Sequence, residues 1–278
     1  MALTRYRPNS PLDRYVDCFW WSRRTQPDPH SEHMLPSGRA QLIFALHETP
    51  IGWRAGASTC WTDWSHGIVH GPQSGFYIAG SKPAGISVGV SFRPGAAGAV
   101  LGTSMEDLAD RHVELAAIWG SRGADLHHQL MSARDPAQAF RILEQNLLAR
   151  IYRPLLLHPA VGQALAAPAG SLSPARVADL QRASGYSPKH FINLFRFAVG
   201  INPKHYYRIR RFNSVVEAVA AGRHSGLGDL AAAVGYSDQA HLTREFREFA
   251  GVTPTQYRPA AGDRPLHHRA AEGAPRTR

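Results

Sequence analysis

The sequence predicts an α+β protein, in which a β-rich barrel or sandwich with following helices precedes an all-α domain. Short apolar runs separated by Gly and Pro fill roughly the first 100 residues, and such runs are typical of strands in barrels and sandwiches. Farther along the chain, apolar residues recur every three to four positions, which is the period of a helix. The last third holds two copies of one helical unit, with a further helical stretch between them.

Length and charge narrow the class of protein. The 278 residues exceed the roughly 100 to 200 of one ordinary domain, so two domains are expected. The formal net charge of +10 favours a polyanionic partner, either nucleic acid or an anionic membrane surface. The first residues lack the apolar core of a signal peptide, and no stretch approaches the ~20 apolar residues that span a bilayer. We therefore expect a cytoplasmic protein that does not enter a membrane.

The cysteine content argues against two ways of stabilising the fold. Only Cys18 and Cys60 are present, far apart in the sequence and outside any Cys-x-x-Cys pair. This spacing supports neither a structural zinc site nor a disulfide framework. We expect both side chains to be buried free thiols.

Three runs illustrate the predicted strands. Residues 39–46, 76–80 and 86–92 are apolar and contain β-branched or aromatic side chains. Segments with Pro and Gly at 35–38 and 93–95 mark the ends of such runs. Strands this short and this closely spaced predict the barrel or sandwich.

Two segments with the signals of a helix N-terminus follow the predicted strands in the sequence. Ser104 is a suitable N-cap for a helix with Glu106 and Asp107 in its first turn, where acidic side chains favour the helix dipole. Asp135 as N-cap and Pro136 at the first helical position begin another helix. The β-rich region therefore carries a helical extension.

Composition marks the predicted domain boundaries. Residues 166–171 are rich in Ala, Pro and Gly, so we place the linker there. We expect an N-terminal β-rich domain with its helical extension over residues 1–165, a helical domain over 171–260 and a disordered tail over 261–278. The tail has no apolar periodicity and few large side chains to bury. Its His267-His268 pair is not expected to bind a metal, since a flexible pair lacks the other ligands that fix the geometry.

The helical domain contains an internal repeat. Residues 177–206 align with residues 227–257 once one extra residue is allowed in the second copy, and twelve of the thirty positions of the first copy are identical. The identical pairs are Asp179/Asp229, Leu180/Leu230, Ala183/Ala233, Gly185/Gly235, Tyr186/Tyr236, Ser187/Ser237, His190/His241, Phe195/Phe246, Arg196/Arg247, Gly200/Gly251, Pro203/Pro254 and Tyr206/Tyr257.

Each copy reads as two helices joined by a three-residue turn. In the first copy, Ser173 and Pro174 supply an N-cap and a first-turn proline, and Gly185 ends the helix in the left-handed conformation that a residue without Cβ adopts readily. Ser187 then caps a second helix, and the second copy repeats the turn as Gly235-Tyr236-Ser237. This is a helix-turn-helix, whose second helix is the candidate reader of a major groove.

The second helix of each copy has one apolar stripe and one polar face. Asn and Gln can pair with adenine, Arg and Lys with guanine, and Thr, Ala or another apolar side chain with a thymine methyl group. Taken singly, each outward residue fits a solvated helix face equally well, but their repetition in two copies favours a groove. The repeated arginines, Arg196 and Arg247, suit phosphate contacts better than base reading. The outward residues are Lys189, Ile192, Asn193 and Arg196 in the first copy, and Gln239, Ala240, Thr243, Arg244 and Arg247 in the second.

The stretch between the copies predicts a long connecting helix. Residues 204–221 have apolar side chains at helical spacing. A helix of about 18 residues spans roughly 27 Å, which is enough to hold two reading helices about one DNA turn apart once their own offsets are included. Residues 171–260 also carry twelve Lys or Arg against six Asp or Glu, so this domain holds more than half of the net positive charge.

The repeated motifs resemble the DNA-binding domain of the AraC/XylS family of bacterial transcriptional regulators. Each copy contains Asp-Leu-x-x-Ala-x-Gly-Tyr-Ser and ends in Gly-x-x-Pro-x-x-Tyr, and the resemblance covers about residues 171–260. Ile192 and Asn193 depart from the family pattern, which often has longer polar or basic residues there. The resemblance implies that the base-contacting positions are Lys189, Ile192 and Asn193 in the first copy, and Gln239, Ala240, Thr243 and Arg244 in the second.

The N-terminal part resembles a sensor-type domain that is fused to such regulators. The segments that carry this resemblance are residues 15–21, 35–38 and 92–96. The resemblance implies a small-molecule or regulatory role without naming a ligand. Trp20 and Trp53 are candidates to line an effector pocket, although aromatic side chains in a barrel also serve as plain core. Arg93 at a strand end can pair with an anionic ligand or equally with a buried carboxylate.

Together these observations predict a sequence-specific DNA-binding transcriptional regulator, most simply an activator. The expected partners are double-stranded DNA, RNA polymerase, a small-molecule effector and a second copy of the chain. No cofactor, metal or catalytic residue is expected. A non-specific architectural nucleic-acid binder remains the first alternative, and it differs in discriminating little between sequences.

A metal-dependent small-barrel enzyme fused to a DNA-binding domain is the second alternative. Five histidines in the β-rich region motivate it, but no His-x-His with a following Glu occurs, as such barrels usually present. Neither a Gly-x-Ser-x-Gly elbow nor a phosphate-binding Gly-x-x-x-x-Gly-Lys loop is present. The five histidines are His30, His33, His47, His66 and His70.

Overall fold

Two β-sheets form the N-terminal half of the computed structural model, which describes residues 2–47, 49, 51–56, 58, 60–64, 66–151, 157–167 and 174–269. The strands of the first sheet are, in spatial order, β1 (Ala2–Tyr6), β2 (Val16–Arg24), β9 (Gly85–Phe92), β4 (Gln41–Ala45), β7 (Gly67–His70) and β10 (His112–Glu114). Those of the second are β11 (His267–Arg269), β3 (Glu32–Met34), β8 (Tyr77–Ala79), β5 (Ile51–Ala55) and β6 (Thr62–Trp64). The predicted β-rich half is confirmed as two sheets that, over the described residues, do not close on each other.

Alternation along β2 explains how the first sheet is covered. Phe19 and Trp21 are buried and point to one face, where Phe19 lies 6.0 Å from Phe140 between ring centroids. Trp20 points to the other face and lies over Gly89 of β9, because successive side chains of a strand alternate. A Cβ at Gly89 would lie 2.3 Å from the Trp20 ring, so only glycine fits there.

Helices follow the sheets, as the sequence predicts. Ser104 accepts a hydrogen bond from the backbone N of Asp107, and Asp135 accepts one from that of Gln138, so both predicted N-caps are confirmed. No described helix combines the length and apolar character needed to cross a bilayer. The helices of this part are α1 (Ala97–Leu101), α2 (Met105–Leu108), α3 (Leu115–Trp119), α4 (Ser121–Met131), α5 (Pro136–Leu148) and α6 (Pro159–Ala166), with a short 3-10 helix at Leu12–Arg14.

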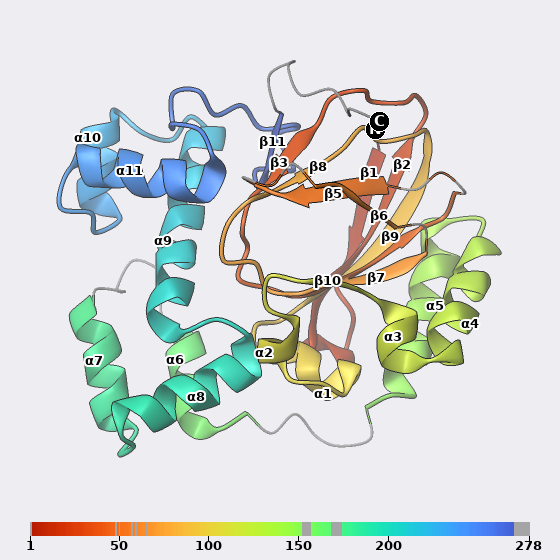
Figure 1. The fold of residues 1–278 in the computed structure, drawn as a ribbon, viewed down its shortest axis with the longest axis horizontal. Coiled ribbons are helices and arrows are strands. Elements are labelled where there is room, and N and C mark those ends of the chain that lie inside the picture. Colours follow the sequence, from red (N-terminus) through yellow and green to blue (C-terminus); the bar gives the residue numbers. More distant parts are fainter. Residues whose placement is uncertain are drawn as a thin grey trace.

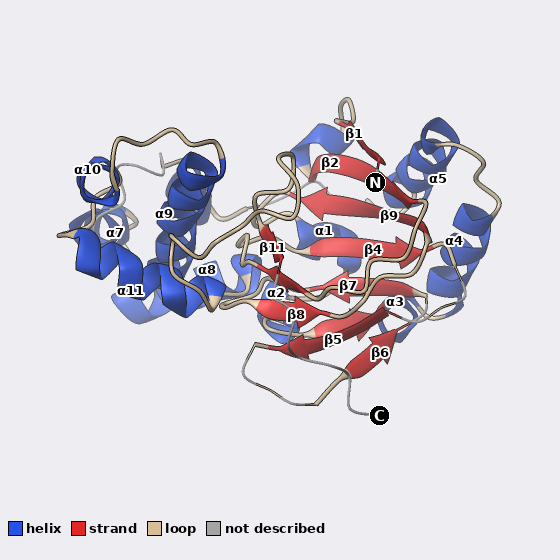
Figure 2. Ribbon diagram, turned by 90° about the horizontal axis from the view of Figure 1, so that it is seen from above, coloured by secondary structure: helices blue, strands red, loops and turns tan. Residues whose placement is uncertain are grey.

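The C-terminal helices form two pairs at the two ends of one long helix (Figure 1). The long helix is α9 (Pro203–Ala220), which confirms the predicted connecting helix at 18 residues. Figure 2 shows this group on one side of the strands and α4 and α5 on the other. The paired helices are α7 (Pro174–Ala183) with α8 (Pro188–Val199), and α10 (Leu227–Ala233) with α11 (Gln239–Ala250).

Helix α6 packs with the C-terminal helices. Its Val161 and Ala164 are fully buried in the core that contains Phe195 and Phe212. The Tyr207 hydroxyl also donates to the Ala164 carbonyl at 2.9 Å. The division at residues 166–171 stays a prediction, and this packing favours a boundary before α6.

The stretch predicted as a disordered tail is ordered up to residue 269. His267–Arg269 forms β11, which pairs antiparallel with β3 and so joins the end of the chain to the N-terminal sheet. The prediction is wrong here because it considered only apolar periodicity and the number of large side chains to bury. Strand pairing and His267 hold β11 instead, and the His267 Nδ1 lies 2.9 Å from an oxygen of the buried Glu32. Residues 270–278 lie outside the described residues.

The two cysteines are free but not both buried. Cys18 in β2 is half-buried, and burial raises the pKa of its thiol. Cys60 is exposed in the segment before β6. The prediction of a buried thiol is therefore wrong for Cys60, which lies between β5 and β6 rather than in a strand of the core.

Candidate nucleic-acid interface

The first helix-turn-helix unit has the predicted local geometry. Gly185 adopts a positive φ of 72° after α7, as a left-handed helix end requires. The Ser187 hydroxyl accepts a hydrogen bond of 3.3 Å from the backbone N of His190 and so caps α8. Ser173, the predicted cap of the preceding helix, lies outside the described residues. The turn between α7 and α8 therefore follows from Gly185 and Ser187.

The second unit is capped one residue later than the repeat suggests. Gly235 again has a positive φ, of 82°, but the residue that accepts from the backbone N of His241 is Asp238, at 2.7 Å. Ser237, the predicted equivalent of Ser187, is followed by the extra residue of the second copy and donates to the Asp238 carboxylate. These bonds, led by that from the His241 backbone, hold the pKa of Asp238 below its usual value. The cap therefore stays charged at the N-terminus of α11, where a negative charge is favourable.

Helices α8 and α11 each bury one stripe of apolar side chains and expose the opposite face to solvent. The outward positions are exposed in the structure except Ile192 and Thr243, which are partly buried at the edge of the stripe. The exposed ones are Lys189, Asn193, Arg196, Gln239, Ala240, Arg244 and Arg247. The stripe residues are Phe191, Phe195 and Val199 in α8, and Leu242, Phe246 and Phe249 in α11.

Phe197 is an outward residue of α8 that was not predicted from the sequence. Its side chain is 64% exposed, although large apolar residues are normally buried. It follows Asn193 by four positions, so the two share one face of α8. That spacing was the available signal. An exposed aromatic ring on this face suits contact with a thymine methyl group.

Arg196 and Arg247 occupy equivalent positions but have different surroundings. An Nη of Arg196 lies 2.6 Å from an Oε of Glu106 in α2, so the first arginine is paired with the N-terminal half. Among the ion pairs of the described residues, none involves Arg247. Sequence symmetry alone gives no hint of this difference.

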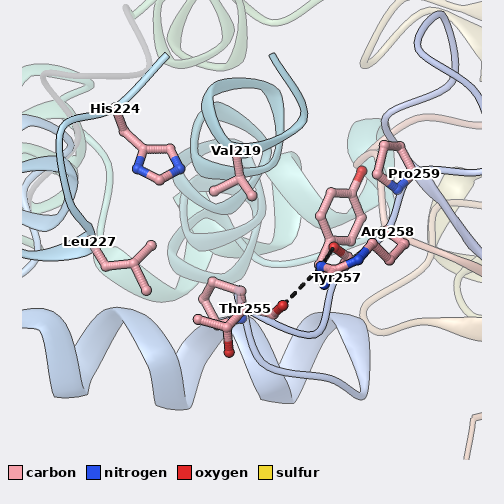
Figure 3. Close-up of a pocket in the computed structure, with 8 residues that line it drawn as sticks. Val219, His224, Leu227, Thr255, Tyr257, Arg258 and Pro259 are labelled. Atoms are coloured by element: carbon pink, nitrogen blue, oxygen red, sulfur yellow. Dashed lines mark hydrogen bonds between the residues drawn. The ribbon is translucent and has the colours of Figure 1, made fainter. Parts of the chain in front are cut away.

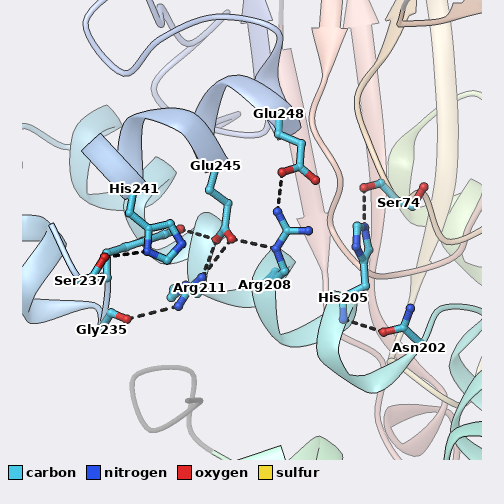
Figure 4. Close-up of polar contacts among 11 residues, drawn as sticks. Ser74, Asn202, His205, Arg208, Arg211, Gly235, Ser237, His241, Glu245 and Glu248 are labelled. Atoms are coloured by element: carbon cyan, nitrogen blue, oxygen red, sulfur yellow. Dashed lines mark hydrogen bonds and ion pairs between the residues drawn. The ribbon is translucent and has the colours of Figure 1, made fainter. Parts of the chain in front are cut away.

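A buried ionic cluster holds α11 on α9 (Figure 4). The carboxylate of Glu245 in α11 is bonded by Arg208 at 2.8 Å, by Arg211 at 2.9 and 3.0 Å, and by the Tyr236 hydroxyl at 2.8 Å. Burial raises the pKa of Glu245, but these bonds outweigh burial and hold the pKa below its usual value. The two arginines therefore contribute to the domain charge without being free to contact DNA. We call Glu245, Arg208, Arg211 and Tyr236 the Glu245 cluster.

Glu245 is a further residue that was not predicted from the sequence. It follows Leu242 of the apolar stripe by three positions, which places a charge at the border of the buried face. Arg208 and Arg211 are likewise three positions apart on α9 and share a face. A charged residue at the edge of an apolar stripe, with two basic residues at helical spacing nearby, was the signal.

The N-terminal half contacts the helical domain directly. His205 in α9 has its Nε2 2.7 Å from the Ser74 carbonyl, and His33 in β3 has its Nδ1 2.9 Å from the Ala250 carbonyl at the end of α11. Gly200, at the end of α8, lies so close to α2 that a Cβ would come within 2.7 Å of the Met105 carbonyl oxygen. The β-rich half therefore touches the end of α11, and α2 touches the end of α8.

A pocket of about 370 Å³ lies beside the second unit (Figure 3). It is formed by the end of α9, the start of α10 and the chain after α11, so it belongs to the Gly-x-x-Pro-x-x-Tyr end of the repeat. None of the outward positions of α8 or α11 lines it. The lining residues are Val219, His224, Leu227, Pro254, Thr255, Tyr257, Arg258 and Pro259.

The three predicted effector residues are not brought together. Trp20 lies over Gly89 in the first sheet, and Trp53 in the second sheet stacks on His112 with 3.7 Å between ring centroids. Arg93 is exposed, and its Nε donates to the Asp13 carbonyl at 2.6 Å. The two tryptophans thus stand in different sheets, and Arg93 is bonded to backbone at the end of β9.

Four histidines of the β-rich half lie against other rings, namely His33, His66, His70 and His112, whereas His30 lies 2.9 Å from Asp28. Over the described residues, no three His, Cys, Asp or Glu side chains lie close enough together to hold a metal ion. His70 and His112 meet at 4.4 Å between ring centroids and both contact Tyr77. Burial lowers the pKa of His70 to about 3 and that of His112 to about 2. Both rings are therefore neutral near pH 7.

The fold and this interface define a protein of the helix-turn-helix DNA-binding class. Residues 180–260 match the family model described as "Helix-turn-helix domain", and residues 4–114 match one described as "Domain of unknown function (DUF6597)". Residues 180–260 therefore form an AraC-type helix-turn-helix domain, as the sequence motifs predicted, and the chain is a DNA-binding transcription regulator. No curated protein sequence matches the chain significantly.

Among solved structures, the chain matches ToxT from Vibrio cholerae at low similarity. One ToxT structure, in a P21 crystal form, has 11% identity and a TM-score of 0.46, and covers 85% of this chain and 96% of that one. An apo form has 10% identity, a TM-score of 0.45 and coverage of 85% and 95%. ToxT with a bound unsaturated fatty acid has 8% identity, a TM-score of 0.45 and coverage of 85% and 93%. These values are too low to transfer a ligand or a mechanism.

Proposed function

We propose that α8 and α11 enter two successive major-groove segments of one DNA site, and that the N-terminal half modulates this binding. The observation that carries the proposal is the placement of the two reading helices at opposite ends of α9, each with a polar face turned away from a buried stripe. The 18 residues of α9 span about 27 Å, close to the ~34 Å of one DNA turn.

The two units contribute unequally to this reading. In α11, Gln239, Ala240, Thr243 and Arg244 offer groups that pair with adenine, guanine or a thymine methyl, so the second unit supplies most of the base preference. In α8, Lys189, Ile192 and Asn193 supply fewer such groups. Arg196 and Arg247 are assigned to phosphates, which set position rather than sequence preference. Arg196 reaches a phosphate only after leaving Glu106.

Selection of bound duplexes from a random library with the full-length chain tests this proposal. The expected motif has two half-elements whose centres are separated by about 10 base pairs, with more information in one half than in the other. A non-specific architectural binder gives no motif, and its affinity falls with salt equally for all sequences. A regulator prefers its site by ~10³-fold or more. Absence of a bipartite motif contradicts the proposal.

We also propose that a small molecule with polar groups acts on the N-terminal half, between the two sheets. Both ring nitrogens of His112 and Nε1 of Trp53 are buried without a hydrogen-bond partner among the described residues. Buried polar atoms are normally satisfied, so a bound molecule that offers them donors and acceptors would stabilise the fold. Trp20, which lies over Gly89 in the other sheet, stays a separate candidate for effector contact, and Arg93 is a candidate only for an anionic group at the end of β9.

A thermal-shift screen of small molecules on the full-length chain tests the effector proposal. Binding between the sheets raises the melting temperature of the wild type and does so less in Trp53→Phe, which keeps an aromatic ring but lacks the N–H donor. An equal shift in both proteins places the ligand elsewhere.

Four expectations remain, namely activation, contact with RNA polymerase, a homodimer and a cytoplasmic location. In vitro transcription with and without the chain is the first measurement, because it tests activation directly.

A further inference from the structure

A reading helix can place its outward side chains on particular bases only if its rotation about its own axis is fixed relative to the rest of the domain. We call this rotation the roll of the helix. Neighbouring positions of a helix differ by about 100° in direction, so a modest roll of α11 would carry Arg244 away from the base edge that it contacts. Close packing of the buried stripe resists this sterically, although the hydrophobic effect itself is not directional. Hydrogen bonds to a fixed carboxylate resist it strongly, since they depend on angle.

The Glu245 cluster provides such bonds for α11. Arg208 and Arg211 reach the carboxylate from α9, and Tyr236 reaches it from the turn before α11. The donors come from two elements and approach one side chain that is only 4% exposed, so the carboxylate is held at several points. The Arg211 guanidinium also lies over the Tyr236 ring at 4.1 Å and donates to the Gly235 carbonyl at 3.2 Å. The turn, α9 and α11 therefore form one rigid unit.

The first unit has no buried carboxylate at the equivalent position. The residue at the position of Glu245 is Leu194, which packs as a partly buried apolar side chain. Tyr186, the equivalent of Tyr236, is 41% exposed, and its hydroxyl lies 3.1 Å from His158 Nε2 at the start of α6. The first unit is thus attached to α6 and, through Arg196 and Glu106, to α2 rather than being fixed to α9 by a buried ion pair.

We propose that Glu245 is a positioning residue for DNA reading, which fixes the roll of α11 on α9 and thereby sets the spacing of half-elements that the protein accepts. Glu245 itself does not contact DNA, because it is buried on the α9 side of the helix. Its neighbours Arg244 and Arg247 face outward and depend on it for their direction. This inference rests on the proposed two-groove binding.

The test uses the full-length chain and the bipartite duplex that the wild type selects. Affinities are measured for this duplex and for a series in which the half-elements are moved closer or farther apart by one or two base pairs. The variants are Glu245→Gln, which removes the charge at nearly constant shape, and Tyr236→Phe, which removes one hydrogen bond and keeps the ring. Leu194→Met, at the same position of the first unit, is the matched control.

The wild type and Leu194→Met are expected to lose about tenfold or more in affinity at the wrong spacing. Glu245→Gln is expected to bind the best spacing less tightly and to distinguish the spacings less than about threefold, with Tyr236→Phe between the two. Reselection with Glu245→Gln should lose base preference in one half-element only.

A merely structural role would lower the amount of folded protein and reduce binding equally at every spacing. A Glu245→Gln variant that folds and keeps the wild-type spacing profile and base preference overturns the inference. If Glu245→Gln does not fold, Tyr236→Phe decides in the same way, since a flattened profile supports the inference and an unchanged one overturns it. Failure of the wild type to select a bipartite motif counts against the proposed function instead, and it is seen before any variant is measured.

Discussion

Glu106 of α2 and Arg196 of the first reading helix form an ion pair, with 2.6 Å between the carboxylate oxygen and the guanidinium nitrogen. The pair joins the N-terminal half to a side chain assigned to a DNA phosphate. If Arg196 binds a phosphate as proposed, DNA binding and this interdomain contact compete for one arginine.

Glu106→Gln is expected to raise DNA affinity, because it frees Arg196 for a phosphate. The gain is limited to about fivefold, since both side chains are 40–45% exposed and such pairs contribute no more than about 1 kcal/mol. Titration of a labelled duplex at fixed salt measures it. Asp125→Asn, which removes one negative charge from an exposed position of α4, is the control for net charge. An equal gain in the control, or a gain that persists in the Glu106→Gln, Arg196→Ala double variant, contradicts the competition.

Arg244→Ala is expected to cost about 1 to 3 kcal/mol at the selected site and to relax the preference at one base pair. The reason is that Arg244 is exposed on the outward face of α11, at the position suited to guanine. Competition binding against single-base variants of the site measures both effects. A loss that is equal for all sequences would assign Arg244 to phosphate.

Arg247→Ala is expected to behave in the opposite way. Because Arg247 is proposed to bind a phosphate, its removal should weaken binding to all duplexes by a similar factor and lower the slope of log affinity against log salt by about one. Measurements at several salt concentrations give this slope. If the variant instead changes the preferred sequence at an unaltered slope, Arg247 reads a base.

Local features of the interface were predictable from the sequence because they depend on neighbouring residues. Gly185 and Ser187 define their turn within a few positions, and the helical periods of α8, α9 and α11 follow from apolar spacing. The extra residue of the second copy shifted the cap from Ser237 to Asp238, which alignment by identity alone did not reveal. Residues close in sequence thus carry enough information for the helix-turn-helix geometry.

Long-range partners were not predictable, because they depend on how distant elements pack. Nothing near Arg196 in the sequence indicates Glu106, which lies in a different domain. The same holds for β11, whose strand partner β3 lies near the opposite end of the chain. Trp20 and Trp53 were grouped as aromatic residues of one region, but sheet order places them in different sheets.

The histidine pair His70 and His112 predicts that the protein loses stability on mild acidification. Their folded pKa values of about 3 and 2 lie below the 6.5 of an unfolded histidine, so below pH 6.5 the unfolded chain binds protons that the folded chain does not. The free energy of unfolding then falls by up to about 1.4 kcal/mol per pH unit for each histidine, or about 2 kcal/mol each between pH 6.5 and 5. Burial, complete or partial, also lowers the pKa values of four other histidines, which act in the same direction. They are His33, His47, His267 and His268.

Denaturant unfolding between pH 7 and 5 tests this with His112→Phe, which keeps a ring against Trp53. The variant should lose less stability on acidification, and the difference should equal the contribution of one histidine. Stability near pH 7 should be unchanged or higher, since two unsatisfied buried nitrogens are removed. His128→Phe at an exposed position of α4 should keep the wild-type pH dependence. Parallel pH profiles for the wild type and His112→Phe contradict the assignment.

Glu32 is predicted to hold the end of the chain on the second sheet. Its carboxylate is 2% exposed, pairs with Lys82 and lies 2.9 Å from His267 Nδ1 in β11 and 3.6 Å from Arg264. Burial raises the pKa of Glu32, but the bond from His267 and the charge of Lys82 outweigh it and hold the pKa well below its usual value. Its stabilising contribution is therefore present above pH 4.5 and is lost as the pH falls further.

Glu32→Gln is expected to lower the free energy of unfolding by about 3 to 5 kcal/mol at pH 7, because it leaves buried positive charge without its partner. It should also release β11, since His267 loses its charged acceptor. Limited proteolysis followed by mass spectrometry would then show faster cleavage near residues 264–269 than in the wild type. Glu114→Gln, an exposed carboxylate at the end of β10, should alter neither quantity. A Glu32→Gln variant that is destabilised but protects these residues as the wild type does would mean that strand pairing with β3 alone holds β11 in place.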